Sequence, residues 1–329
     1  MDTLQQKIFA AGHLKRASAK GCFINVPSQC LESPIKAHSI SESKYLSVIA
    51  KDGKMLMPGH YNGRVVFEEQ GKKKASTFPG FCGPHDTIFN PIDIDDHVPG
   101  NKKHEFLFAM RAAAREYWAK TTQSKGMEEL MRLRTSSEER IKLLGKDMPI
   151  DAPDSIDLLM QQSIIKGQRD TEEIRKFFNE NYAKGNYGAI HTVTIELPKF
   201  YPVVASSMFN IELDFEGNIV NDLENLTTRM RTSFFSIVPQ EDKTFILLSC
   251  RKSDAKFLKF LEAIDNMPDK GVVASNILCV HTENVCMNLD YFYSLDIETR
   301  KLFYDLWGHS AMPNPRTRLV EDPRLNIFV

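Results

Sequence analysis

The chain of 329 residues lacks long apolar runs and the common nucleotide-binding and hydrolase motifs. No segment approaches the ~20 consecutive apolar residues that span a bilayer, and the N-terminal segment has no apolar core long enough for a signal peptide. G-x-x-x-x-G-K-[ST], G-x-G-x-x-G and G-x-S-x-G are absent, so nucleotide hydrolysis and lipase-type chemistry have no support in the sequence. The formal net charge of −1 provides no global basic field of the kind that indicates a nucleic-acid-binding protein.

Cysteine is scarce, with six residues in the whole chain. Hydrophobic residues make up 42% of the sequence and charged residues 26%, which is an ordinary balance for a soluble globular protein. Without a secretion signal or a membrane span, we expect a cytoplasmic protein in a reducing compartment. There, clustered cysteine and histidine indicate metal binding before they indicate disulfide bonds.

Three of the cysteines gather near the N-terminus together with two histidines. The order is Cys22-x7-Cys30-x7-His38, a long gap, and then Cys82-x2-His85. Thiolate and imidazole are preferred zinc ligands, and four of them close a tetrahedral structural site. We therefore predict a structural zinc ion bound by Cys22, Cys30, Cys82 and His85. Two alternatives remain open: His38 replaces His85 as the fourth ligand, or the cysteines are buried and inert.

The hydrophobic pattern predicts an α+β protein in three regions. These are a zinc-binding module over residues 1–100, a helical region over 101–188, and a mixed sheet with helices over 189–329. Period-two alternation predicts strands over 64–68, 189–197, 203–215, 233–238 and 244–250. Helical spacing predicts helices over 3–17, 86–92, 105–121, 124–144, 155–182, 253–266 and 298–307. Residues 43–50 and 272–281 fit a strand or a helix, and the tail 313–329 is expected to lie extended on the surface.

The N-terminal segments GCFINVPSQC, IKAHSIS and FCGPHDTIF together resemble the treble-clef zinc module of the HNH, or His-Me finger, endonucleases. The resemblance covers the N-terminal quarter of the chain. The phrase ASTFPGFCGPHDTIFNPID also resembles a recurrent pattern of uncharacterised bacterial proteins of similar length, and that pattern names no function. In the endonuclease group the zinc is structural, a separate hairpin histidine is the general base, and a nearby divalent ion stabilises the scissile phosphate. His38 matches that base by its place between the two ligand pairs.

The resemblance implies a zinc-containing, metal-dependent nuclease that uses Mg²⁺ or Mn²⁺ on nucleic acid, with bacterial defence as one role. A phosphate-binding cleft should then gather basic side chains such as Lys36, Arg64 and Lys72. Ala37 stands where an acidic residue often precedes the base, and Asn62 is the candidate for the middle asparagine. The alternative is a non-enzymatic scaffold, in which zinc stabilises the module and the C-terminal half binds a protein partner.

Several other charged and thiol groups allow two interpretations each. Asp86 and the aspartates within 93–96 fit a second metal site or an acidic surface turn. The basic run 72–74 fits a phosphate contact or a solvated loop. The remaining cysteines have no partners at metal-ligand spacing, so we expect structural roles for Cys250, Cys279 and Cys286.

Overall fold

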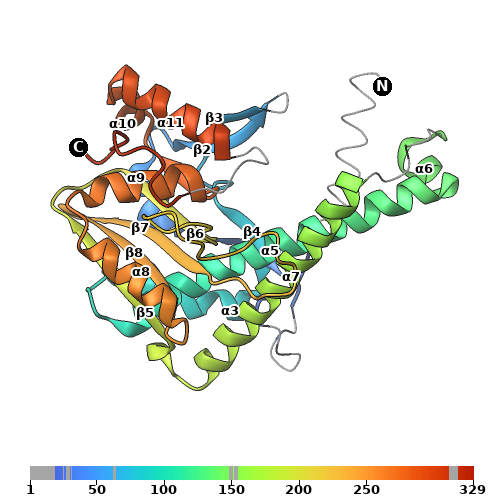
Figure 1. Ribbon diagram of the computed structural model, residues 1–329, viewed down its shortest axis with the longest axis horizontal. Coiled ribbons are helices and arrows are strands. Elements are labelled where there is room, and N and C mark those ends of the chain that lie inside the picture. The colour runs from blue at the N-terminus through green and yellow to red at the C-terminus, as the bar shows by residue number, and fades with distance from the viewer. Residues whose placement is uncertain are drawn as a thin grey trace.

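A computed structural model describes most of the chain and shows a mixed α+β protein (Figure 1). The described residues are 19–24, 26, 30, 32–61, 64–147, 151, 155–310 and 318–329. The expected helix over residues 3–17 and the candidate Asn62 lie outside these ranges.

A seven-stranded antiparallel sheet forms the centre of the described structure. In spatial order its strands are β3 (Arg64–Gly71), β2 (Lys54–Tyr61), β9 (Val285–Met287), β6 (Val203–Phe209), β7 (Ser233–Gln240), β8 (Lys243–Arg251) and β5 (Ile190–Leu197). The expected strand over 203–215 ends earlier, because its partner β7 begins opposite Phe209 at Ser233. One sheet thus unites segments from residues 1–100 and 189–329.

Both faces of this sheet are covered, which explains the unbroken burial of its central strands. On β6, Val203 and Ala205 belong to one hydrophobic cluster, whereas Val204 and Met208 belong to another. Successive side chains of a strand point to opposite faces, so the two clusters lie on opposite sides of the sheet. All seven residues of β6 are accordingly buried, including the polar Ser206 and Ser207.

Helices of different regions form the two covering layers (Figure 1). One layer contains α5 (Lys102–Thr135) and α7 (Ser155–Ala183), and the other contains α8 (Ala255–Asp265), α9 (Lys270–His281), α10 (Leu289–Ser294) and α11 (Ile297–Ser310). The sequence of residues 272–281 is compatible with a strand or a helix, and in the structure the segment belongs to the helix α9. The prediction of two helices over 105–121 and 124–144 was wrong in its boundary, because α5 continues to Thr135. The break comes at Ser136, whose side chain accepts a hydrogen bond from the Glu139 N–H and begins α6 (Ser137–Leu144).

A second, two-stranded sheet carries the N-terminal module. β1 (Ile35–His38) pairs antiparallel with β4 (Thr77–Phe81), and the long connection between them forms a π-helix (Glu42–Leu46), the short α2 (Ser47–Ile49) and the β2–β3 hairpin. A helical run follows β4 directly: α3 (Gly83–Asp86), a 3₁₀ turn (Thr87–Phe89) and α4 (Asn90–Ile94). The helix expected over 86–92 therefore begins at Gly83 and contains a 3₁₀ segment.

The sequence predicts that the tail 313–329 lies extended on the surface, but its described part, residues 318–329, is partly buried. Leu325, Ile327 and Phe328 are buried in the cluster beneath α9 and α11. The Ile327 N–H donates to Ser275 Oγ at 2.9 Å, and Tyr201 Oη donates to the Phe328 carbonyl at 3.0 Å. Apolar contacts and these hydrogen bonds hold the segment in the core, although its proline and arginine content predicts a surface position.

His97, between α4 and α5, is a neutral histidine buried in an apolar environment. Its residue is 2% exposed, and its ring lies 5.9 Å from Phe108, 5.3 Å from Phe245 and 6.2 Å from His104, centroid to centroid. Neither ring nitrogen has a hydrogen-bond partner among the described residues. Burial, with smaller contributions from His104 and Lys44, lowers the pKa of His97 to about 4.

Replacing His97 with phenylalanine should reduce the sensitivity of the protein to acid. The unfolded chain binds a proton at this residue below its ordinary pKa of 6.5, whereas the folded protein binds it only near pH 4. The neutral His97 therefore contributes to the free energy of unfolding above pH 6.5, and this contribution is lost as the pH falls toward 4. At a pH of about 5 the loss relative to neutral pH is about 2 kcal/mol. Urea unfolding at neutral and at mildly acidic pH should show that His97→Phe loses less stability than the wild type by this amount. Equal losses would contradict this account of His97.

Candidate metal centre and the adjoining cavity

Three separate segments bring the predicted zinc ligands together. Cys22 precedes Phe23, whose backbone N–H donates to the Gly80 carbonyl of β4 at 2.8 Å. This bond holds Cys22 beside the strand that leads to Cys82. The Cys30 N–H donates to the Val26 carbonyl at 2.9 Å, and Cys30 completes the set of three thiols.

Cys82 and His85 come from the junction of β4 and α3. Cys82 immediately precedes α3, and His85 lies within its single turn. Pro84 occupies the first turn, where a backbone N–H would have no helical partner. Residues three apart lie on the same side of a helix, so both side chains can point at one position.

The four ligand atoms surround a common point. The Nδ1 atom of His85 lies 3.3 Å from the Sγ atoms of Cys22 and Cys30 and 3.2 Å from that of Cys82. The sulfurs of Cys22 and Cys82 are 3.9 Å apart, and all four ligand atoms lie within 4.8 Å of one another. A tetrahedral zinc site places two thiolates about 3.8 Å apart and a thiolate and an imidazole about 3.6 Å apart. The group could hold a metal ion such as zinc.

Hydrogen bonding alone does not account for this geometry. A ring nitrogen carries one hydrogen or one lone pair, so Nδ1 can satisfy one of the three sulfurs that surround it. Burial lowers the pKa of His85, which favours the neutral imidazole, the form that offers a lone pair to a metal. In the adjoining core, Phe23 and Phe89 each pack against Phe81.

The other cysteines lie elsewhere, as the sequence predicted. Cys250, Cys279 and Cys286 are buried free thiols in the two hydrophobic clusters. Burial raises the pKa of each, to about 12 for Cys250. These thiols stay protonated at neutral pH and act as small apolar side chains.

His38 is not part of the Cys/His group. It lines a neighbouring polar cavity of about 660 Å³. Its Nε2 atom lies 3.3 Å from the Lys72 carbonyl oxygen and 3.8 Å from Glu42 Oε2. A carbonyl oxygen only accepts hydrogen bonds, so Nε2 donates to it and Nδ1 keeps the lone pair of the neutral ring.

Basic and acidic side chains line the same cavity. Of the expected basic residues, Lys36 and Lys72 contribute to the lining, whereas Arg64 begins β3 and its side chain is not described. Arg111 of α5 is a basic contributor that sequence reasoning missed. Its guanidinium donates to both carboxylate oxygens of Asp93 at 2.6 Å and stacks over the Phe89 ring.

One helical run carries His85 of the Cys/His group and three residues that line the cavity. Asp86, Asn90 and Asp93 line the cavity at spacings of four and three residues, which places them on one side of the run. The ligand His85 directly precedes Asp86 and points to the metal group instead. The spacing of these three polar residues is visible in the sequence, but Glu42 and Arg111 reach the cavity only through tertiary structure.

Comparisons with known proteins give no relative for this chain. No known protein-family model matches it, no curated protein matches it, and no solved structure matches it. Within the described residues, no helix is long and apolar enough to cross a membrane.

The purified protein should contain one tightly bound zinc ion per chain. Removing one ligand in Cys82→Ala should reduce the zinc content to a small fraction and lower the melting temperature, because metal binding contributes to folding free energy. Elemental analysis and thermal melting measure both effects.

Cys250→Ala is the matched control, because it removes a buried thiol outside the group. It should retain the full zinc content whatever its effect on melting. Wild-type protein without zinc, or equal zinc loss in both variants, would contradict the assignment.

Proposed function

We propose that the protein is a zinc-containing, metal-dependent nuclease of the HNH type, with His38 as general base. The observation that carries the proposal is the separation of His38 from the Cys/His group. His85 provides the fourth donor atom of that group, whereas His38 lines a polar cavity that also contains lysine, arginine and carboxylate side chains. A zinc ligand would point at the thiols, and a general base would face such a cavity.

The order of elements also supports the proposal. An antiparallel pair, β1 and β4, is followed directly by the helical run that starts at Gly83, and the metal group lies where the second strand meets the helix. This order is the one that the resemblance to a treble-clef module implies. The base sits at the end of the first strand and the ligand pair at the start of the helix.

The hydrogen bond of the His38 ring leaves one of its nitrogens available to abstract a proton. Because Nε2 donates to the Lys72 carbonyl, Nδ1 can take a proton from a water molecule as that water attacks the scissile phosphorus atom. The phosphate ester bond to the leaving oxygen then breaks, and solvent protonates that oxygen. Lys36, Lys72 and Arg111 provide positive charge for the phosphate in the same cavity.

The cavity also contains oxygen ligands for a hard cation. Asp86 and Asn90 are the residues that would hold Mg²⁺ or Mn²⁺, since Asp93 is already paired with Arg111. When bound, such an ion would supply electrostatic stabilisation of the charge that develops on the phosphate.

His38→Ala should abolish most of the cleavage of plasmid DNA or RNA in Mg²⁺ or Mn²⁺ while retaining zinc. A general base of this kind contributes roughly two to four orders of magnitude in rate. Cleavage rate, zinc content and melting temperature should be measured on the same preparation. His191→Ala is the control, because His191 lies on β5 and lines neither the cavity nor the metal group.

Two outcomes would overturn the proposal. Zinc loss in His38→Ala would mean that His38 supports the metal group. Full cleavage in His38→Ala, or no cleavage by zinc-loaded wild-type protein, would remove the nuclease assignment. The last result would favour a scaffold whose zinc only stabilises the fold.

A further inference from the structure

A second cavity, of about 430 Å³, is walled by α5, α7, β6 and the end of α9. Its volume falls in the range of roughly 300 to 1,000 Å³ that is typical of small-molecule sites. The proposed nuclease uses none of its residues.

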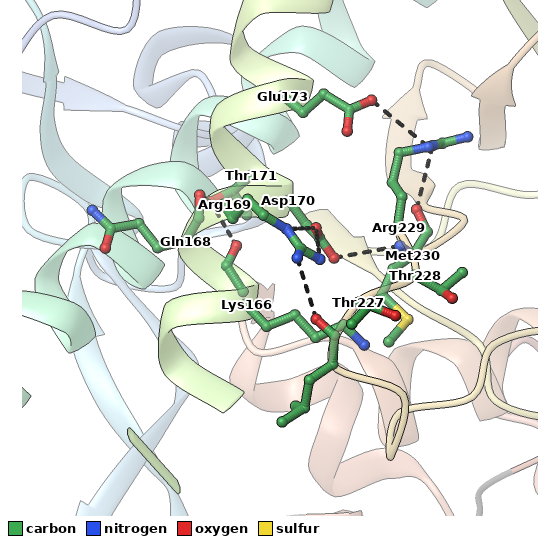
Figure 2. Close-up of polar contacts among 12 residues, drawn as sticks. Lys166, Gln168, Arg169, Asp170, Thr171, Glu173, Thr227, Thr228, Arg229 and Met230 are labelled. Carbon is green, nitrogen blue, oxygen red and sulfur yellow. Dashed lines mark hydrogen bonds and ion pairs between the residues drawn. The ribbon is translucent and has the colours of Figure 1, made fainter. Parts of the chain in front are cut away.

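The wall of this cavity is held in place by a set of charged contacts (Figure 2). Lys166 Nζ donates to the Asn225 carbonyl at 2.5 Å, and Arg169 donates to the Leu226 carbonyl at 3.2 Å. Asp170 accepts a hydrogen bond from the Met230 N–H at 3.3 Å. These contacts fix the loop before β7 against α7, so the cavity is formed without a ligand.

Arg115 of α5 lines this cavity and has no hydrogen-bonding or ion-pair partner among the described residues. Its Nε atom is buried and unpaired, and its guanidinium stacks on the Trp118 ring, 4.8 Å from the centroid. The other arginines of α5 and α7 each contact a carboxylate; they are Arg111, Arg132, Arg134, Arg169 and Arg175. Arg115 is half-buried, and its buried Nε–H has no acceptor, which costs free energy that an anionic ligand would recover.

The acidic residues nearest Arg115, Glu116 and Glu283, act on it as neighbouring charges, which oppose the lowering of its pKa by burial. Glu116 pairs with Lys120 at 3.4 Å, and Asp170 pairs with Arg169 at 2.9 Å. Glu283 is exposed at the rim and forms no ion pair with Arg115 within the described structure. Within the described residues, the Arg115 guanidinium therefore has acidic neighbours but no direct ion-pair partner.

His281 provides a second unpaired group in the same cavity. Its Nε2 atom is buried and has no partner among the described residues, and its ring stacks on Phe209 with centroids 4.9 Å apart. Burial lowers the pKa of His281 to about 4, although a hydrogen bond to the backbone of Arg318 has the opposite, smaller effect. The ring is thus neutral, and the free Nε2 accepts a hydrogen bond from an N–H or O–H group.

We propose that this cavity binds a small molecule that carries a phosphate or carboxylate group and a hydrogen-bond donor. Arg115 binds the anionic group, and His281 Nε2 accepts the hydrogen bond. The apolar wall from Phe209, Met230 and Ile174 covers the remainder of the molecule.

Inorganic phosphate and acetate are the two probes of the anion site. Each is titrated into the full-length, zinc-loaded protein at constant ionic strength, and the melting temperature and the heat of binding are recorded. A ligand that binds only the folded protein raises the melting temperature in a saturable manner. We expect saturable binding of at least one probe, and the better probe distinguishes a phosphate site from a carboxylate site.

Arg115→Gln should remove this saturable effect, and Arg115→Lys should weaken binding by about tenfold or more because an ammonium lacks the planar pair of donors. Arg132→Gln is the matched control, since Arg132 lies on the same helix and is exposed and paired with Glu129. It should bind like the wild type. Absence of saturable binding for both anions, or binding that is unchanged in both Arg115 variants, would overturn the proposal.

Discussion

The convergence of three thiols and one imidazole on a single point is the constraint on which the N-terminal module depends. The four donor atoms come from Cys22 and Cys30, which precede β1, and from Cys82 and His85, where β4 meets α3. The short helix α3 has one turn, too short to be stable alone in water. A bound metal ion would join these segments with a free energy that belongs to folding.

The same helical run connects this group to the polar cavity. His85 points to the thiols, and Asp86 and Asn90 point to the cavity beside His38. A rigid metal group would therefore fix the position of the residues that we propose as ligands of the divalent ion. The module is also tied to the large sheet, because Asn284 donates to Ser39 Oγ at 2.9 Å, directly next to His38. The C-terminal half is therefore packed directly against the module that contains His38.

The sequence predicted those features that depend on local pattern. Ligand chemistry and the x2 spacing identified Cys82 and His85, and alternation identified β5, β7 and β8. The choice between His38 and His85 could not be made, because both spacings are compatible with a tetrahedral site. β2 was missed because Pro58 interrupts its pattern. In the structure Pro58 pairs with Phe67 of β3, and the pairing of β2 with β9 is limited to Leu56.

Other features depend on tertiary contacts that no local pattern encodes. The tail was expected on the surface from its proline and arginine content, yet Ile327 and Phe328 fill a site formed by Ser275 and Tyr201. Arg111 and Arg115 look alike in sequence, one helical turn apart. Only the fold gives Asp93 to the first and leaves the second unpaired.

Anomalous X-ray scattering from crystals grown with Mn²⁺ tests the central claim most directly, because it locates both metals in one measurement. The account places a zinc peak between the sulfurs of Cys22, Cys30 and Cys82 and His85 Nδ1, and a separate manganese peak beside Asp86 and Asn90, facing His38. A zinc peak that includes His38 as ligand, or manganese that binds away from this cavity, would contradict it.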